Sequence, residues 1–194
     1  MNNIIELPID VYSKIAAGEV IERPSSVVRE LIDNSIDAGA NEITIKVSEG
    51  GMEKIIVSDN GSGIEKDDFP LALKKHATSK IRYINDLLKL STMGFRGEAL
   101  ASIAEISKTT ITSNTDPEGK KSGYRLSNFD EKPYSIEPTA SKKGTKIEVS
   151  DIFYNLPARK KFIKSASQEF TNIKKTTGDK ALSNPEISFN LIHN

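Results

Sequence analysis

Several residue types are scarce or missing in this chain of 194 residues. It has no cysteine and only two histidines, His76 and His193. The absence of cysteine excludes disulfides, thiolate metal sites and a cysteine nucleophile, and it suits a reducing cytoplasm. Two histidines argue against a zinc site and against a histidine-based catalytic triad.

Neither sign of charge is in excess, because 27 lysines and arginines balance 27 aspartates and glutamates. This balance argues against a strong general polyanion binder, but it leaves room for a local basic patch. No apolar run approaches membrane-spanning length, and the N-terminus lacks the basic-then-apolar order of a signal sequence. With 37% hydrophobic and 28% charged residues, the composition predicts a soluble folded protein.

The common glycine-rich nucleotide loops are also missing. No G-x-x-x-x-G-K-[ST] occurs, and no G-x-G-x-x-G follows a predicted strand. The sequence therefore argues against a P-loop nucleotide site in this chain.

Apolar periodicity predicts the fold class. A short amphipathic helix in an N-terminal arm, residues 1–23, precedes a helix that runs from Pro24 to about Asp37 and stops at Gly39. Further helices are predicted within 61–75, 98–106 and 168–182. Strands are predicted within 41–50, 50–60, 107–114, 122–129, 134–138, 144–153 and 185–194. Helices followed by a run of strands predict an α+β two-layer sandwich, with a mixed, mainly antiparallel sheet and helices on one face.

Four polar residues form a stripe on the helix after Pro24. Glu30, Asp33, Asn34 and Asp37 follow the i, i+3, i+4, i+7 spacing of one helix face, opposite apolar residues that can pack a core. A solvated face is the ordinary interpretation of such a stripe. A binding or catalytic surface is the alternative, and the motifs that follow decide between them.

A carboxylate and two glycines follow the second predicted strand. In "SDNGSGI", Asp59 ends an apolar strand, and Gly61 and Gly63 come directly after it. The carboxylate can accept a hydrogen bond from an exocyclic amine such as adenine N6, and the glycines allow backbone to approach a flat ligand closely. Taken alone, the same letters also fit a plain Asn-Gly turn.

Three later motifs could contact phosphate or begin a strand. "KHATSKI" offers two hydroxyls and an ammonium group at Thr78, Ser79 and Lys80, and "GFRGEAL" places Arg96 between two glycines just before a helix. "KKGTKIEV" puts Gly144 and Thr145 at the start of a strand. Each motif alone also fits an ordinary loop or turn.

Together, the acidic helix, Asp-x-Gly-x-Gly, Thr-Ser-Lys, Gly-x-x-Gly and Gly-Thr resemble the GHKL superfamily of ATP-binding proteins. This superfamily includes the DNA gyrase B subunit, a heat-shock chaperone, histidine kinases and MutL. The stretches "IAAGEVIERPSSVVRELIDNSIDAGA", "DNGSGI", "KHATSKI" and "GFRGEALASIAEIS" are most similar to the MutL family of DNA mismatch-repair proteins. The resemblance runs from about Ile4 to the end of the chain and implies a Bergerat-type GHKL ATP-binding fold.

The resemblance implies roles for the residues of the helix and the first loop. Glu30 corresponds to the general base and Asn34 to the Mg²⁺ ligand, and their i, i+4 spacing suits a water beside a metal-bound phosphate. Asp37 would contact loop backbone or act through water. Asp59 would bind adenine, with Thr145 helping through a shared water, and Gly61 and Gly63 would line the base pocket.

An ATP lid is implied for residues 74–97. A lid that orders on phosphate would close over the bound nucleotide. The residues expected to contact phosphate there are Thr78, Ser79, Lys80, Gly94, Phe95, Arg96 and Gly97.

The implied cofactors are ATP and Mg²⁺, and the implied function is a slow ATPase that gates a dimeric clamp on DNA. The arm would cross to the other copy of a homodimer through Ile4, Leu7, Val11 and Ile15, although packing on its own domain is an alternative. A mismatch-recognition protein and DNA are the expected partners of the longer protein, in the bacterial cytosol near the nucleoid and away from any membrane. Basic stretches at 158–165 and 172–180 fit either a weak DNA contact or a solvated face.

The domain boundaries follow from the same resemblance. An ATP-binding domain is expected over residues 24–185, and residues 186–194 would form its last strand or begin a second domain. Since that second domain supplies a lysine to the γ-phosphate in the family, we expect this chain to bind ATP but hydrolyse it poorly. Another GHKL ATPase, such as a chaperone or a type II topoisomerase subunit, and a non-hydrolysing ATP-sensing module are the alternatives, and Glu30 argues against the last of these.

Overall fold

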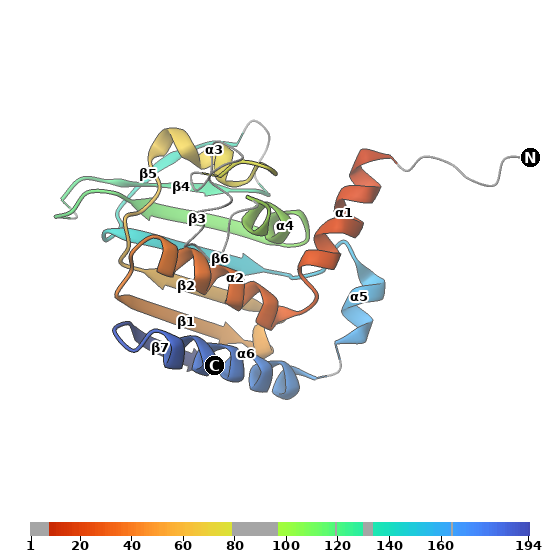
Figure 1. Ribbon diagram of the computed structural model, residues 1–194. Coiled ribbons are helices and arrows are strands. Elements are labelled where there is room, and N and C mark those ends of the chain that lie inside the picture. The colour runs from red at the N-terminus through yellow and green to blue at the C-terminus, as the bar shows by residue number, and fades with distance from the viewer. Residues whose placement is uncertain (1–7, 79–96, 119, 130–133, 164) are drawn as a thin grey trace, which may run out of the picture.

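A seven-stranded sheet with helices on one face organises the chain (Figure 1). The computed structural model describes residues 8–78, 97–118, 120–129, 134–163 and 165–194. Its α-helices are α1 (Ile9–Val20), α2 (Pro24–Asp37), α3 (Phe69–Ala72), α4 (Ala99–Glu105), α5 (Pro157–Phe162) and α6 (Ala166–Ser183), with 3₁₀ helices at Glu49–Gly51 and Lys66–Asp68. The strands are β1 (Glu42–Ser48), β2 (Lys54–Asp59), β3 (Lys108–Asn114), β4 (Gly123–Ser127), β5 (Glu137–Thr139), β6 (Gly144–Ser150) and β7 (Ser188–His193).

The strand order in the sheet is β5-β4-β3-β6-β2-β1-β7. Every neighbouring pair is antiparallel except β1 and β7, which run parallel at one edge. The predicted mixed, mainly antiparallel sheet with helices on one face is therefore confirmed. The order also brings the C-terminal end of β2 beside the N-terminal end of β6, because Ser58 pairs with Lys146.

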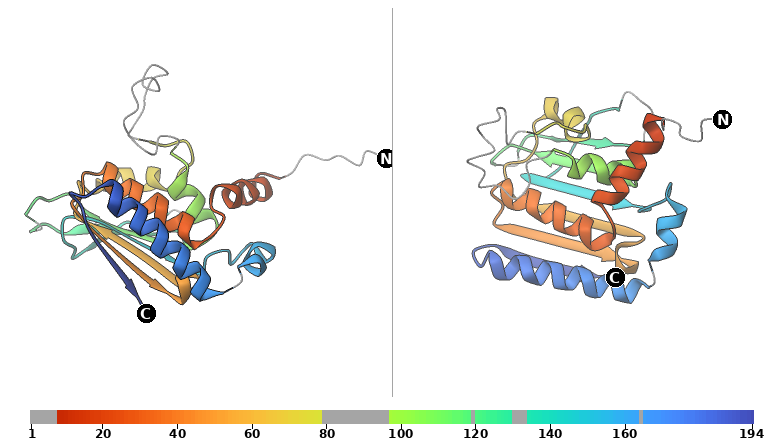
Figure 2. Two further views of the ribbon diagram at one scale, coloured as in Figure 1. Left: turned by 60° about the horizontal axis from the view of Figure 1, so that its bottom comes forward. Right: turned by 45° about the vertical axis from the view of Figure 1, so that its right-hand side comes forward.

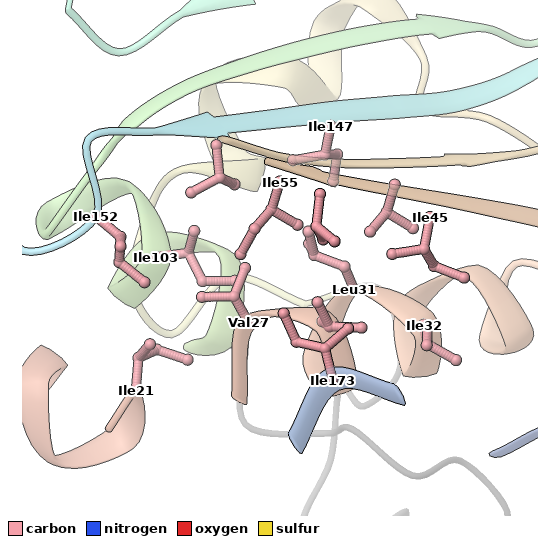
Figure 3. Packing of buried hydrophobic residues seen from close by; sticks show 14 of the residues in the cluster. Ile21, Val27, Leu31, Ile32, Ile45, Ile55, Ile103, Ile147, Ile152 and Ile173 are labelled. Atoms are coloured by element: carbon pink, nitrogen blue, oxygen red, sulfur yellow. The ribbon is translucent and has the colours of Figure 1, made fainter. Parts of the chain in front are cut away.

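Helix α2 forms where the sequence predicts it, from Pro24 to Asp37, with Gly39 just beyond its end. Proline suits the first turn because its missing N–H would have no helical partner there. Val27, Leu31 and Ile32 are fully buried beneath the sheet (Figure 3). The burial of this apolar face fixes the opposite, polar face of α2 at the surface of the domain.

Helix α6 lies beside α2 on the same face of the sheet (Figure 2). Its Ile173 joins the core near Leu31 (Figure 3). A half-buried ion pair between Lys180 and Asp33 links the two helices at their surface. Asp33 therefore belongs to the helix packing, although it shares a stripe with the other polar residues of α2.

Two elements differ from the prediction. The strand expected over 134–138 is wrong in its position: β5 covers Glu137–Thr139, while Tyr134 and Ile136 pack against a small cluster around Phe69 instead of pairing with β4. Helix α5 was not predicted, since the basic stretch there was assigned no element. It has no buried residue, so it leaves no apolar periodicity in the sequence.

Helix α1 packs on the core at its C-terminal end, and the Lys75 ammonium group also donates to the Ser13 carbonyl at 3.3 Å. Ala17 and Ile21 are buried in the main core, whereas Ile9, Tyr12 and Ile15 are exposed. Ile4 and Leu7 lie outside the described residues. Across the described ranges, no helix is long and apolar enough to cross a membrane.

Two glycines of this fold should respond oppositely to the same substitution. Gly144 has a φ of +108°, and a Cβ there would lie 2.0 Å from the Asp59 carbonyl oxygen, whereas Gly178 in α6 has nothing within 4 Å of such a Cβ. We expect Gly144→Ala to lower the free energy of unfolding by about 3 kcal/mol or more, because the backbone must move. We expect Gly178→Ala to raise it by about 0.5–1 kcal/mol. Urea unfolding measures both, and a Gly144→Ala variant as stable as the parent would contradict the geometry.

Candidate functional site

Three segments that are distant in sequence meet at the carboxylate of Asp59, the last residue of β2. Oδ2 accepts a hydrogen bond from the Ser35 hydroxyl of α2 at 2.9 Å. Oδ1 accepts from the backbone N–H groups of Gly61 at 2.9 Å and Thr145 at 3.1 Å. The side chain is therefore held in one orientation by α2, by the loop after β2 and by the start of β6.

Burial raises the pKa of Asp59 above its ordinary value, while the hydrogen bonds from Gly61, Ser35 and Thr145 act in the opposite direction. A carboxylate oxygen has more than one acceptor direction, and Ser35 supplies the one hydrogen bond that the structure gives to Oδ2 among the described residues. Oδ2 can therefore accept a further hydrogen bond from a ligand. A neutral donor such as an aromatic amine suits this half-buried position, since it brings no second charge to desolvate.

The loop after β2 is packed too closely for side chains. A Cβ at Gly61 would lie 2.8 Å from the Ala38 carbonyl oxygen, and one at Gly63 would lie 2.6 Å from the Asn114 carbonyl oxygen. The backbone N–H of Ser62 also donates to Ala38. The two glycines thus let this loop lie directly against the end of α2 and the end of β3.

Ser35 and Ser113 belong to this cluster, and the sequence analysis did not identify them. The Ser113 hydroxyl accepts from the backbone N–H of Ile64 at 2.8 Å, donates to the Gly144 carbonyl at 2.9 Å and lies 3.0 Å from the Thr145 hydroxyl. Both serines are almost completely buried, with 3% and 1% of their surface exposed. A hydroxyl at a core-facing position of a helix or strand was the signal that could have found them, because buried polar groups need partners.

The polar face of α2 carries Glu30, Asn34 and Asp37, and each of them is only partly buried. The carboxylate of Glu30 accepts from the Arg29 guanidinium at 3.0 Å, and 24% of the Glu30 side chain is exposed. Glu30 and Asn34 are one helical turn apart on the helix that also provides Ser35 to Asp59. The arrangement presents a carboxylate and an amide oxygen on the element that forms one wall of the Asp59 cluster.

The segment after α3 returns to the start of α4. The backbone N–H of His76 donates to the Gly97 carbonyl at 3.1 Å, and the His76 ring lies 3.2 Å from the Glu98 carboxylate. A Cβ at Gly97 would lie 2.4 Å from the Ala77 carbonyl oxygen. The first residues of the predicted lid, at His76 and Ala77, therefore lie against its last residue, Gly97. The other lid residues predicted to contact phosphate lie outside the described residues: Ser79, Lys80, Gly94, Phe95 and Arg96.

Metal binding at this site would need few protein ligands. Within the described ranges, no group of three or more His, Cys, Asp or Glu side chains is arranged to hold a metal ion. Mg²⁺ commonly takes one or two protein oxygens and completes its shell with water and phosphate. The amide oxygen of Asn34 fits that pattern. The described residues of this surface do not form a set of several carboxylates around one position.

Comparison with known families gives one match over residues 21–151, to the family described as histidine kinase-, DNA gyrase B- and HSP90-like ATPase. The chain is 49% identical to a DNA mismatch repair protein MutL from Streptococcus sanguinis over 192 residues. That alignment covers 99% of this chain and 29% of the relative. A MutL from Lactococcus lactis subsp. cremoris is 50% identical over 194 residues, with 100% of this chain and 29% of the relative covered. The chain therefore spans less than a third of the length of these relatives.

Solved structures give the same result. The chain is similar to the N-terminal domain of a DNA repair protein, with a TM-score of 0.77 and 35% identity, covering 93% of this chain and 51% of the other. It is also similar to the ATPase domain of Aquifex aeolicus MutL in complex with ADP. There the TM-score is 0.68 and the identity 30%, with 90% of this chain and 61% of the other covered. The resemblance predicted from the motifs is confirmed.

Proposed function

We propose a function from one premise: this chain belongs to the histidine kinase-, DNA gyrase B- and HSP90-like ATPase family, and within it to the MutL type. It is an ATP-binding domain of a DNA mismatch-repair protein. Because the chain covers 29% of the similar MutL proteins, the activity and the partners of the longer protein are part of the proposal.

The geometry of Asp59 is the observation that supports this function. Its side chain is half-buried, and the orientation of its carboxylate is fixed by Ser35, Gly61 and Thr145. Such an acceptor suits the exocyclic amine of adenine, and the glycine loop beside it leaves room for backbone to lie against a flat base. Thr145 contacts Asp59 directly through its backbone N–H, and its hydroxyl lies near Ser113, where it can share a water with the base.

Glu30 and Asn34 would act at the triphosphate end. Glu30 orients a water and accepts its proton as the water attacks the γ-phosphorus, while Asn34 provides an oxygen for Mg²⁺. Bound Mg²⁺ would neutralise charge on the phosphates. Asp37, Gly61 and Gly63 complete the nucleotide site. Residues 74–97 form a lid whose phosphate contacts are Thr78, Ser79, Lys80, Gly94, Phe95, Arg96 and Gly97. We expect slow turnover, because residues outside this chain would complete the γ-phosphate site.

ATP binding would also control assembly in a cytoplasmic repair protein. The exposed apolar residues Ile9, Tyr12 and Ile15 of α1 are available to a second copy of the chain. ATP-dependent pairing of two such domains would close a clamp, with DNA and a mismatch-recognition protein as partners of the longer protein. Ile4, Leu7 and Val11 would add to the contact between the two copies.

The base specificity of the site tests the proposal directly. We expect this chain to bind a non-hydrolysable ATP analogue with Mg²⁺ at least about tenfold more tightly than the matching inosine analogue, because inosine replaces the amine with a carbonyl that faces the Asp59 carboxylate. Isothermal titration calorimetry measures both affinities. Equal affinity for the two bases would contradict the role of Asp59, and the absence of binding to both would contradict the proposed function.

A further inference from the structure

Two loops at one end of the sheet enclose a shallow hollow with a volume of about 610 Å³. One loop joins β3 to β4, and the other joins β5 to β6. The residues that line the hollow are Pro117, Glu118, Lys120, Lys121, Ser122, Ala140, Ser141, Lys142 and Lys143. We call this feature the lysine hollow, because four of these nine residues are lysines.

The backbone of both loops is held by Asn114, the last residue of β3, which is 3% exposed. Its side-chain amide donates to the carbonyls of Lys121 at 2.9 Å and Ser141 at 2.8 Å. Asp116 accepts from the backbone N–H groups of Lys120 and Lys121 at 2.7 and 2.9 Å. The two lysine pairs therefore project from backbones that are fixed relative to each other, and an anion that binds between them need not order the loops.

Positive charge dominates the lysine hollow. Glu118 is the acidic residue in its lining, and it pairs with Lys120 at 2.6 Å. Asp116 lies nearby, but its carboxylate faces the backbone N–H groups of its own loop, and these hydrogen bonds lower its pKa. Lys121, Lys142 and Lys143 are exposed. The chain as a whole has no net charge, so this concentration of lysines is a local feature.

We propose that the lysine hollow binds the phosphodiester backbone of duplex nucleic acid. Several ammonium groups on two adjacent loops match a ligand that carries closely and regularly spaced charges, and each phosphate contact releases counterions. The lining contains no aromatic residue on which a base could stack, and no arginine to form a bidentate contact with a base edge. The contact therefore positions the duplex without reading its sequence. This choice of polyanion rests on the proposed function, whereas the charge and shape of the hollow do not.

The test compares two double charge reversals by fluorescence anisotropy with a labelled DNA duplex at low salt. Lys142→Glu with Lys143→Glu changes the hollow. Lys46→Glu with Lys54→Glu, at exposed positions of β1 and β2, makes the same change of charge away from the hollow and from both basic stretches. We expect about a tenfold loss of affinity for the first variant and less than about a twofold loss for the second. We also expect the slope of log affinity against log salt to fall by about 2 for the hollow variant.

Equal losses in the two variants, or no loss in either, would overturn the proposal. Displacement of the duplex by tripolyphosphate at equal phosphate concentration would also overturn it, because the hollow would then be a small-anion site. Titration of both variants with the ATP analogue separates this proposal from the proposed function. We expect unchanged nucleotide binding in both variants, whereas a parent that binds no nucleotide would contradict only the nucleotide site.

Discussion

Asp59→Asn should weaken binding of the ATP analogue about 100-fold while leaving the fold intact. The carboxamide has the same shape as the carboxylate. Its oxygen can still accept from Gly61 and Thr145, and its NH₂ group can donate to Ser35, which in turn donates to the Leu31 carbonyl. That NH₂ group, however, would face the adenine amine, so two donors would meet. Calorimetry measures the loss, and we expect the variant to discriminate less against the inosine analogue.

The stability of the same variant gives an independent check. Burial raises the folded-state pKa of Asp59, so the folded state favours the protonated carboxyl group. The stability that this group contributes is therefore fully present at low pH and is lost as the pH rises through the folded-state pKa. The variant without nucleotide should therefore melt at least as high as the parent at neutral pH, and its advantage should shrink as the pH falls toward the ordinary aspartate range. Asp179→Asn, at an exposed position of α6, is the matched control and should change neither property. A variant that loses both nucleotide binding and thermal stability would show a structural role only.

Glu30→Ala should reduce ATP hydrolysis by about 10²–10⁴-fold, the usual contribution of a general base, while leaving nucleotide affinity within about threefold of the parent. The carboxylate is partly exposed and pairs with Arg29, so its removal leaves no unpartnered buried charge. Single-turnover hydrolysis with enzyme in excess measures slow rates, in this chain and in one extended to the length of the similar MutL proteins.

The control for Glu30 is Glu186→Ala, at an exposed residue before β7. We expect parental hydrolysis and binding for this variant. Unchanged hydrolysis in Glu30→Ala would show that Glu30 is not the general base. A loss of nucleotide affinity that matches the loss of hydrolysis would show that Glu30 contributes to ground-state binding instead. A parental rate no greater than that of buffer, in both chain lengths, would contradict the ATPase proposal.

Most of the fold could be predicted from the sequence, because its elements carry strong local signals. The bounds of α2 follow from Pro24, the apolar spacing and Gly39, and β1 and β2 follow from alternation of apolar and polar residues. Helix α5 could not be predicted in this way, since it buries no side chain and its basic residues have no periodic pattern. The parallel pairing of β7 with β1 also has no local signal, because the register depends on contacts across almost the entire chain.

The site was predictable in its motifs but not in its contacts. Asp59, the glycines and Thr145 were expected together, and the structure joins Asp59 to Gly61 and Thr145. The motifs could not show that Ser35 and Ser113 hold this cluster, because serines are common at exposed positions and only the packed fold reveals their burial. The polar stripe on α2 also serves two purposes that its spacing does not distinguish. Asp33 pairs with Lys180 of α6, whereas Glu30, Asn34 and Asp37 lie on the face beside the Asp59 cluster.

The parallel edge pair of the sheet has a consequence for synthesis on the ribosome. Glu42 of β1 pairs with Ser188 of β7, so roughly 150 residues must be translated after β1 before its outer edge finds a partner, a delay on the order of 10 s at ordinary elongation rates. During that interval β1 can pair with β2 on one side only, and its other row of backbone donors and acceptors is open to other nascent chains. Chains that stop before β7 should therefore aggregate more readily than those that include it.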